Sequence, residues 1–330
     1  MDSKFDIITI GDSTVDTFIK IHEASIECDI NKKDCKICVE YGGKIPVESI
    51  SYGIAGNAAN VAAGCSTLEM KTAIYTHLGH DWQGTMIKSA LEKLNIASDY
   101  IVIDDKKSSN LSVVLTYQGE RTIFVYHQDW FYSLPKLGET SWVYLTSLSE
   151  SFTDSNIIDE VAHFIDRARA KLVFAPGTYQ IKANVKRFKN TLERCFIFIC
   201  NLEEAKNILE IEAGEKPPIR EILDKLHALG PQIIVITDGE EGSYASDGQK
   251  YLKLGVFPTK LVEKTGAGDA YAAAFIAALN RNLNLGEAMV WGTINSAQVI
   301  REVGAQNGLL NLDGVERYRK SVPNLIATSL

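Results

Sequence analysis

Long apolar runs are missing from this sequence. No run approaches the ~20 residues that a membrane-spanning helix requires, and the first predicted strand begins within a few residues of Met1, with no signal peptide before it. Positive charge is also scarce, since 34 Lys and Arg stand against 42 Asp and Glu, for a net charge of −8. We therefore expect a cytoplasmic protein whose partners include neither a membrane nor a nucleic acid.

Motifs of several other protein classes are absent as well. No Gly-x-x-x-x-Gly-Lys-Ser/Thr occurs, which excludes a P-loop nucleotide site. The six histidines show no His-x-x-x-His spacing, and six cysteines in 330 residues do not suggest a disulfide framework. The chain has no clear internal repeat and no low-complexity linker. Its length and its 45% of hydrophobic residues suit one large α/β domain or two smaller ones.

Short apolar runs alternate with helical patterns along the whole chain. Almost every residue in these runs is apolar, which is typical of strands buried on both faces of a parallel sheet. The runs are 6–10, 72–78, 142–145, 172–174, 196–199 and 233–236. The helical patterns are 57–68, 82–94, 155–170, 218–229, 269–280 and 285–302. This alternation predicts a layered α/β fold.

Two segments break the alternation. One covers residues 18–51, and the other, 111–126, consists of two β-like runs around Gln118 and Gly119 that predict a hairpin. From the residues alone, these are two β-like insertions in the layered fold.

The stretch 264–279 carries the strongest chemical signal. It reads Lys-Thr-Gly-Ala-Gly-Asp and then continues as a long Ala-rich helix. The first turn of a helix has unpaired N–H groups and about half a positive charge, and glycine lets an anion approach that backbone closely. Gly266, Ala267 and Gly268 thus predict an anion hole, with the carboxylate of Asp269 beside it. Such a pair suits phosphoryl transfer to a hydroxyl.

This stretch resembles the second signature of the PfkB-type carbohydrate kinases, the ribokinase-like sugar and nucleoside kinases. Four other segments resemble motifs of that family, in the family's order and over nearly the whole chain. They are Ala-Gly-Asn-Ala-Ala-Asn at 55–60, Gly-His-Asp-Trp-Gln-Gly at 79–84, Asn-Leu-Glu-Glu at 201–204 and Thr-Asp-Gly-Glu-Glu-Gly at 237–242.

The resemblance implies a fold and a domain organisation. It implies one kinase domain over 1–330, built as a three-layer α/β/α structure around a mostly parallel sheet. Segments 18–51 and 111–126 would form a small β-lid over the sugar site, and that lid would also be the interface of a homodimer.

Carboxylates and amides would bind the acceptor sugar. Asp16 follows the first predicted strand, near the edge of the sheet where open α/β folds bind ligands, and carboxylates accept hydrogen bonds from hydroxyl pairs. Asp12 is the competing carboxylate and could instead be a turn residue. Gly56, Asn57 and Asn60 match family positions that contact the sugar, while Asn57 could also be the N-cap of the helix that starts there.

A similar Gly-Gly-Lys at 42–44 is rejected as the sugar-binding signature. It lacks the Asn three residues after its second glycine, and Pro46 cannot lie in the body of the helix that should follow.

The remaining motif residues would bind ATP and its metal. The resemblance implies Asp269 as the general base, with Gly266, Ala267 and Gly268 donating N–H groups to the transferred phosphate. Glu204 with Asn201 would hold Mg²⁺, partly through water; the alternative is that Glu204 is only an acid at a helix start. Thr237, Gly239 and Gly242 would line the nucleotide, and Asn295 would reach the adenine.

Two positions depart from the family pattern. The acid that usually precedes the anion hole is Asp, whereas Glu263 followed by Lys264 stands here. Some members bind K⁺ in this region, and the departure from Asp weakens the expectation of a K⁺ site here. The strand 142–145 is followed by Thr146 and Ser147, without the acid that ribokinases carry nearby.

The cysteines of the first insertion allow several chemistries. Cys28, Cys35 and Cys38, with His22 just upstream, could bind structural zinc. The alternatives are free thiols or a disulfide within the lid. The other cysteines, Cys65, Cys195 and Cys200, lie in apolar segments and are expected in the core.

We therefore expect an ATP-dependent kinase that phosphorylates a primary hydroxyl of a free pentose or hexose. The alternative is a nucleoside kinase of the same family, for which a lid with aromatic walls would be needed. Phe124, Tyr126, Trp130 and Phe131 could supply such walls. A non-catalytic ligand-binding module on the same fold is a third possibility, disfavoured because the anion hole and Asp269 are both intact.

Overall fold

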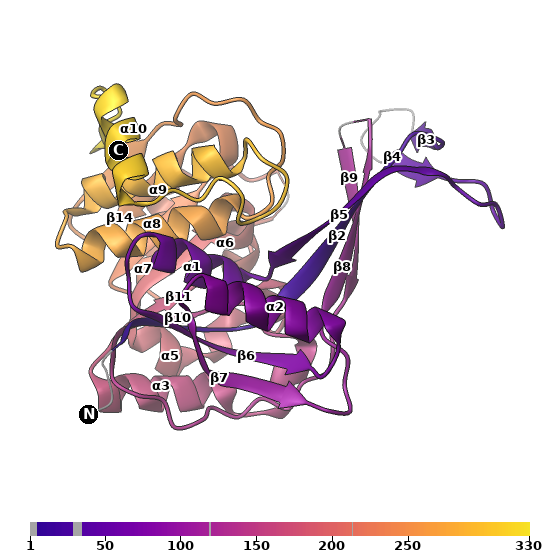
Figure 1. Ribbon diagram of the computed structural model, residues 1–330. Coiled ribbons are helices and arrows are strands. Elements are labelled where there is room, and N and C mark those ends of the chain that lie inside the picture. The colour runs from indigo at the N-terminus through magenta and orange to yellow at the C-terminus, as the bar shows by residue number, and fades with distance from the viewer. Residues whose placement is uncertain (1–4, 29–34, 119, 213) are drawn as a thin grey trace.

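The computed structural model describes residues 5–28, 35–118, 120–212 and 214–330, which are built around one large sheet (Figure 1). Its ten strands follow the order β16-β15-β14-β13-β12-β11-β10-β1-β6-β7. Neighbours from β13 to β7 pair in parallel, and β14, β15 and β16 add antiparallel pairs at one edge. The strands are β1 (Phe5–Ile10), β6 (Thr72–Gly79), β7 (Ala97–Asp104), β10 (Thr140–Leu145), β11 (Lys171–Phe174), β12 (Cys195–Asn201), β13 (Ile233–Thr237), β14 (Ser243–Ser246), β15 (Tyr251–Leu254) and β16 (Thr328–Ser329).

Ten helices lie in the described residues. They are α1 (Asn57–Thr67), α2 (Trp82–Lys93), α3 (Ile157–Ala168), α4 (Thr178–Lys182), α5 (Lys189–Glu193), α6 (Leu202–Leu209), α7 (Ile219–His227), α8 (Ala267–Asn280), α9 (Leu285–Val299) and α10 (Leu312–Ser321). Six match the helical patterns of the sequence closely, and α4, α5, α6 and α10 lie outside those patterns. Three short 3₁₀ turns are η1 (Glu150–Asp154), η2 (Val185–Arg187) and η3 (Gly239–Glu241). None of the helices in the described residues combines the length and apolarity that crossing a bilayer would take.

Both faces of the large sheet are covered by helices. In β10, Val143 packs into a core shared with α3, α6 and α7, whereas Trp142 and Tyr144 pack into a core shared with α8 and α9. Because successive side chains of a strand point to opposite faces, a strand between two helical layers must be apolar at every position. The predicted three-layer α/β/α architecture with a mostly parallel sheet is thus confirmed, and Cys65, Cys195 and Cys200 are buried in it as expected.

Helices α1 and α8 lie side by side on one face of the sheet (Figure 1). Small residues let them approach closely. A Cβ added to Gly64 of α1 would lie only 2.6 Å from the Cβ of Ala273 in α8, and α8 is rich in alanine along its buried length. The amino-terminal ends of the two helices therefore come together at one edge of the sheet.

A second, four-stranded sheet, here called the small sheet, projects from the body (Figure 1). Its order is β5-β2-β8-β9, formed by β2 (Thr14–Ile21), β5 (Val47–Ala55), β8 (Leu111–Tyr117) and β9 (Glu120–Tyr126). Strands β8 and β9 form the antiparallel hairpin that the sequence predicts at 111–126. Strands β2 and β5 extend beyond both ends of segment 18–51, so Asp16 lies within a strand.

The cysteines at the tip of the first insertion do not form a zinc site. Strands β3 (Ser25–Cys28) and β4 (Cys35–Cys38) pair as a separate hairpin, in which Cys28 and Cys35 are joined by a disulfide. Oxidised sulfurs cannot act as thiolate ligands, so the predicted set of His22 with three cysteines is wrong and the disulfide alternative holds. Within the described ranges, no group of three or more His, Cys, Asp or Glu could hold a metal ion.

Candidate active site

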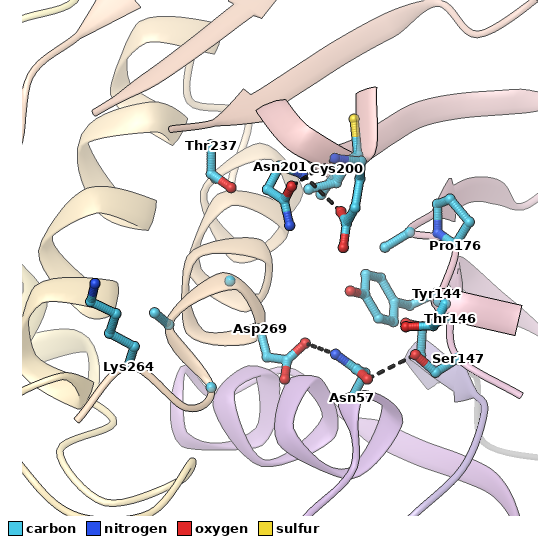
Figure 2. Close-up of a pocket in the computed structure, with 18 residues that line it drawn as sticks. Asn57, Tyr144, Thr146, Ser147, Pro176, Cys200, Asn201, Thr237, Lys264 and Asp269 are labelled. Carbon is cyan, nitrogen blue, oxygen red and sulfur yellow. Dashed lines mark hydrogen bonds between the residues drawn. The ribbon is translucent and has the colours of Figure 1, made fainter. Parts of the chain in front are cut away.

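Two adjoining cavities lie at the carboxyl ends of the parallel strands. The first has a volume of about 330 Å³ and is lined by the ends of β10, β11 and β12 and by the start of α8 (Figure 2). The second, of about 520 Å³, lies between the start of α8, helix α9 and the segment that follows β15. The two cavities share Thr237, Lys264, Ala267 and Gly268. Open α/β sheets bind ligands at this edge, which makes the pair the candidate active site.

The turn that opens α8 depends on Gly266. This residue is the N-cap and has a φ of 78°, in the left-handed region that favours glycine. A Cβ here would lie 2.5 Å from the carbonyl oxygen of Ala305, whereas a Cβ at Gly268 would meet no atom within 4 Å. Gly266 is therefore needed by the backbone, and Gly268 leaves open space beside the first-turn N–H groups of the helix. Gly266, Ala267 and Gly268 all line the first cavity, as an anion hole requires.

Asp269 is the third residue of α8 and lines the first cavity. Its side chain is held from both sides, because Asn57 Nδ2 donates to Oδ1 at 2.9 Å and Asn60 Nδ2 donates to Oδ2 at 2.8 Å. Only 7% of the residue is exposed. Burial raises the pKa of this carboxyl to about 6, against the opposing effect of the two amide hydrogen bonds. A carboxylate with that pKa is ionised at neutral pH and is a better base than an exposed Asp.

The two asparagines bond to Asp269, and their predicted contact with the sugar stays a prediction. Their amide nitrogens bind Asp269, and their oxygens are also occupied: Ser147 Oγ donates to Asn57 Oδ1 at 2.8 Å, and Gln306 Nε2 donates to Asn60 Oδ1 at 3.1 Å. Figure 2 shows the row from Ser147 through Asn57 to Asp269. In this arrangement both asparagines orient the carboxylate, and Asn57 alone of the pair lines the first cavity.

Gly56, rather than Asn57, is the N-cap of α1. The capping alternative for Asn57 is therefore wrong, because its side chain is committed to Asp269. Gly56 has a φ of 93°, and an added Cβ would lie 2.5 Å from the carbonyl oxygen of Asp12. This close approach explains the glycine by backbone packing and does not require contact with a sugar.

Glu204 is an acid at a helix start, as one of the two alternatives expected, and its binding of Mg²⁺ stays a prediction. Asn201 Oδ1 accepts from the N–H of Glu204, and Glu204 Oε2 accepts from the N–H of Asn201, each at 2.8 Å, which forms a capping box at the start of α6. Both residues also line the first cavity. Burial raises the pKa of the Glu204 carboxyl, because the charged form loses its contact with water. A cation bound beside Glu204 would have the opposite effect and favour the charged form.

The second cavity has the lining expected for a nucleobase. Most of its surface comes from apolar side chains, and the predicted Thr237, Gly239 and Gly242 lie on its wall. The apolar residues are Val256, Phe257, Pro258, Leu261, Tyr271, Ala297 and Ile300.

Asn295 does not reach this cavity. The residue is fully buried, its Nδ2 donates to the carbonyl of Ala270 at 2.8 Å, and its Oδ1 accepts from the N–H of Leu310 at 3.0 Å. The predicted contact with adenine is wrong, because the side chain ties α9 to α8 and to the segment before α10. Thr293 and Ser296, which flank it on α9, line the cavity instead.

Asp16 and Asp12 are both buried, and neither lines the two cavities. Asp16 lies in β2 opposite Ser112, whose side chain donates to it. Burial raises its pKa, and the charge of Arg121 opposes that shift. Asp12 accepts from the hydroxyl of Tyr132 at 2.6 Å, and burial raises its pKa to about 7. Asp12 is thus a core carboxyl and not a solvated turn residue.

Several cavity residues were absent from the sequence prediction. They follow the strands directly: Thr146 and Ser147 follow β10, and 175–178 follow β11. The rule that ligands lie beyond the carboxyl ends of parallel strands would have selected them. Lys264, treated only as a departure from the family pattern, lines both cavities.

Glu263, near which a K⁺ site was considered, already contacts a positively charged side chain. Glu263 forms an ion pair with Arg121, which reaches it from β9 of the small sheet. A K⁺ site here stays a prediction.

Comparisons with known proteins identify the family of this chain. A family model described as pfkB family carbohydrate kinase matches residues 17–312. An ATP-dependent 6-phosphofructokinase of Thermoanaerobacterium thermosaccharolyticum is 24% identical over 96% of this chain and 94% of its own. A 5-dehydro-2-deoxygluconokinase of Halalkalibacterium halodurans is also 24% identical, over the same shares of the two chains.

A solved structure shares the fold. Arabidopsis thaliana ribokinase, complexed with ribose and ATP, superposes with a TM-score of 0.79 at 19% identity, covering 96% of this chain and 99% of its own. With the family model matched over most of the chain, the conclusion is that this protein belongs to the pfkB family of carbohydrate kinases and is a phosphotransferase with a hydroxyl acceptor.

Proposed function

We propose that this kinase transfers the γ-phosphoryl group of ATP to a primary hydroxyl of a free pentose or hexose. One observation carries the proposal: Asp269, a buried carboxylate with a raised pKa, is fixed by two amides beside the open first turn of α8. A proton acceptor and an anion hole next to each other are the two parts that phosphoryl transfer to an alcohol needs.

The two cavities suit the two ends of ATP. The apolar second cavity would take the adenine, and the residues it shares with the first cavity would lie along the phosphates. Glu204 and Asn201 would hold Mg²⁺, with phosphate oxygens and water completing the octahedral shell that this ion prefers. Bound there, Mg²⁺ would neutralise charge on the phosphates. These residues fit Mg²⁺, because the ion usually takes only one or two carboxylates from the protein. Glu204 supplies one carboxylate at the cavity wall, and burial raises its pKa.

The protein's contribution to the reaction is mainly positioning. Asp269 would accept the proton of the sugar hydroxyl as its oxygen bonds to the γ-phosphorus and the bond from phosphorus to the leaving β-phosphate oxygen breaks. The amides of Asn57 and Asn60 keep both carboxylate oxygens fixed during this transfer. Backbone N–H groups at Gly266, Ala267 and Gly268 would stabilise the negative charge on the phosphoryl oxygens.

The small sheet supplies the acceptor side of the site and would act as a lid. Asp16, Arg121 and Val125 lie on one face of it, because directly paired strand residues share a face. That face is the one from which Arg121 contacts the loop before α8. Asp16 and Asp269 make this neighbourhood acidic, with Glu263 already paired to Arg121, which favours a neutral sugar over one that already carries a phosphate.

The nucleoside alternative has less support. Phe124 and Tyr126 alternate with Val125 along β9, so they lie on the opposite face of the small sheet from Asp16. Trp130 is buried and stacked on His77. Of the four aromatic residues considered as walls for a base, these three are therefore directed elsewhere.

Asp269→Asn should reduce kcat by about a hundredfold or more, the size of a general-base loss, while KM for ATP and for the sugar change little. In the wild type, the base is ionised above its pKa, so kcat/KM should fall as the pH drops through about 6. Steady-state kinetics between pH 5 and 8 would measure both effects. Near wild-type turnover of the Asn variant would exclude Asp269 as the base.

Alanine substitutions at the two glycines should separate stability from chemistry. Gly266→Ala forces a left-handed φ and a clash with Ala305, so we expect a clear drop in Tm. Gly268→Ala meets open space, so Tm should stay close to that of the wild type while the methyl group reduces kcat and weakens ATP binding. Calorimetry and ATP titration would test this, and full activity of the Gly268 variant would contradict the anion hole.

A substrate panel is the direct test of the proposed function. ATP-dependent product formation should be highest with a free pentose or hexose, lower with nucleosides and lowest with sugar phosphates. Asp16→Asn should raise the sugar KM strongly and the ATP KM little, because a buried acceptor of hydroxyl hydrogen bonds is weakened. Preference for a sugar phosphate over every free sugar would refute the substrate assignment and leave the kinase assignment standing.

We further propose that the outer face of the small sheet pairs with a second copy of this chain. Ile50, Tyr52, Phe124 and Tyr126 lie on that face, and each is about half exposed. Contiguous apolar surface of this kind marks interaction sites.

Light scattering at micromolar concentration should therefore find a dimer. Phe124→Ser should shift it toward monomer, because the change places a hydroxyl in the apolar face. The control is Ile326→Ser, which alters an equally exposed apolar residue away from the small sheet and should leave the dimer intact. A wild-type monomer would remove the proposal.

A further inference from the structure

The loop that leads into the anion hole is organised by one carboxylate, Glu263. Its Oε1 accepts from the N–H of Thr265 at 2.8 Å and from the Thr265 hydroxyl, and its Oε2 accepts from the N–H of Gly304 at 3.3 Å. The neighbouring Ala305 is the residue against which Gly266 packs. Glu263 thus joins the two backbone segments that together fix the turn at the start of α8.

This carboxylate is largely out of water, since its side chain is 12% exposed. A charge in that position requires a partner of opposite sign. The described residues provide it from the small sheet: Nη1 of Arg121, in β9, pairs with Glu263 Oε1 and also donates to the Thr265 hydroxyl. The same guanidinium is near enough to Asp16 to lower its pKa against the effect of burial.

The counter-ion of the anion-hole loop therefore belongs to a separate sheet. If the small sheet lifts from the body, Glu263 loses its partner, because β9 carries Arg121 with it. The remaining buried charge would then be unpaired, and the loop would rearrange or admit water. If the sheet is seated, the carboxylate is paired and its hydrogen bonds to the two backbone segments are strengthened.

Resting on the proposed kinase function, we propose that Arg121 is a positioning residue for phosphoryl transfer. Through Glu263 it orders the turn at 264–268, so that the anion hole is formed only while the small sheet covers the acceptor. ATP bound alone would meet a loosely ordered anion hole. Transfer to water would thereby be suppressed until the acceptor and the lid are both in place.

The chain offers a matched control for this contact. Lys20 lies on the same face of the small sheet as Arg121, with Thr116 between them on β8. Its ion pair with Glu48, at 2.7 Å, is solvent-exposed. Arg121→Met and Lys20→Met each remove one positive charge from that face, and only the first removes the contact to Glu263.

Hydrogen exchange tests the contact without any substrate. Amide exchange across 263–269 should accelerate about tenfold or more in Arg121→Met, because the local structure opens more easily, and should match the wild type in Lys20→Met. Unchanged exchange in the Arg121 variant would overturn the proposal. This readout stands even if the sugar panel gives no product, in which case the proposed function fails and the effect on the loop is still measured.

Kinetics then separate positioning from direct substrate binding. Arg121→Met should lower kcat by about tenfold or more, with the sugar KM within about threefold of wild type, and added guanidinium ions should restore part of kcat. An increased sugar KM with unchanged kcat would overturn the proposal, because Arg121 would then contact the acceptor directly.

A second substitution keeps the test valid if Arg121→Met does not fold. Glu263→Gln preserves shape and leaves Arg121 in place, and it should produce the same faster exchange and lower kcat. Where both single variants fold, the double variant Arg121→Met with Glu263→Gln should lose no more kcat than the more severe single variant. The reason is that both substitutions break the same interaction. Fully additive losses would show that the two residues act separately and would overturn the coupling.

Discussion

The site depends on the contact between Asp269 and the two asparagines of α1. Asn57 and Asn60 are one helical turn apart, so both can reach the same carboxylate at the start of α8. The hydrogen bonds keep a buried charge solvated by protein groups, and they fix its direction. The turns at Gly56 and Gly266 determine where α1 and α8 begin, and the asparagines determine where the Asp269 carboxylate points. The direction of this carboxylate is therefore set by two helices and not by a mobile loop.

The sequence predicted those parts of the fold in which local pattern and burial agree. Near-continuous apolar runs gave the central strands, because a strand between two helical layers has no solvent face, and Gly-Ala-Gly-Asp located the helix start that bears the base. Prediction failed where a polar side chain had several partners to choose from. Asn295 bonds within the core, and Asn57 bonds to a residue more than two hundred positions away. Spacing in the sequence holds no signal for such choices.

The two sheets divide the tasks of the site. The large sheet and its helices carry Asp269, the turn at 266–268 and both cavities, whereas the small sheet brings Asp16 and Arg121. Residues of the small sheet alternate between an inner face, which carries Asp16, Ser112 and Arg121, and an outer face with exposed aromatic side chains. That alternation explains why Phe124 and Tyr126, although they flank Val125 in the sequence, do not line the same face as Asp16. It also explains why one strand, β9, can serve both surfaces.

The close approach of α1 and α8 at Gly64 and Ala273 has a consequence for how this sequence can diverge. A single methyl group added at Gly64 would force the helices apart, and because the asparagines and the base sit on these helices, their hydrogen bonds would lengthen with the separation. Gly64, which lines neither cavity, thus controls the position of the Asp269 carboxylate through the spacing of the two helices. During evolution, the contact between α1 and α8 should therefore accept fewer substitutions than the walls of the second cavity. A substitution in those walls would change ligand affinity without moving Asp269.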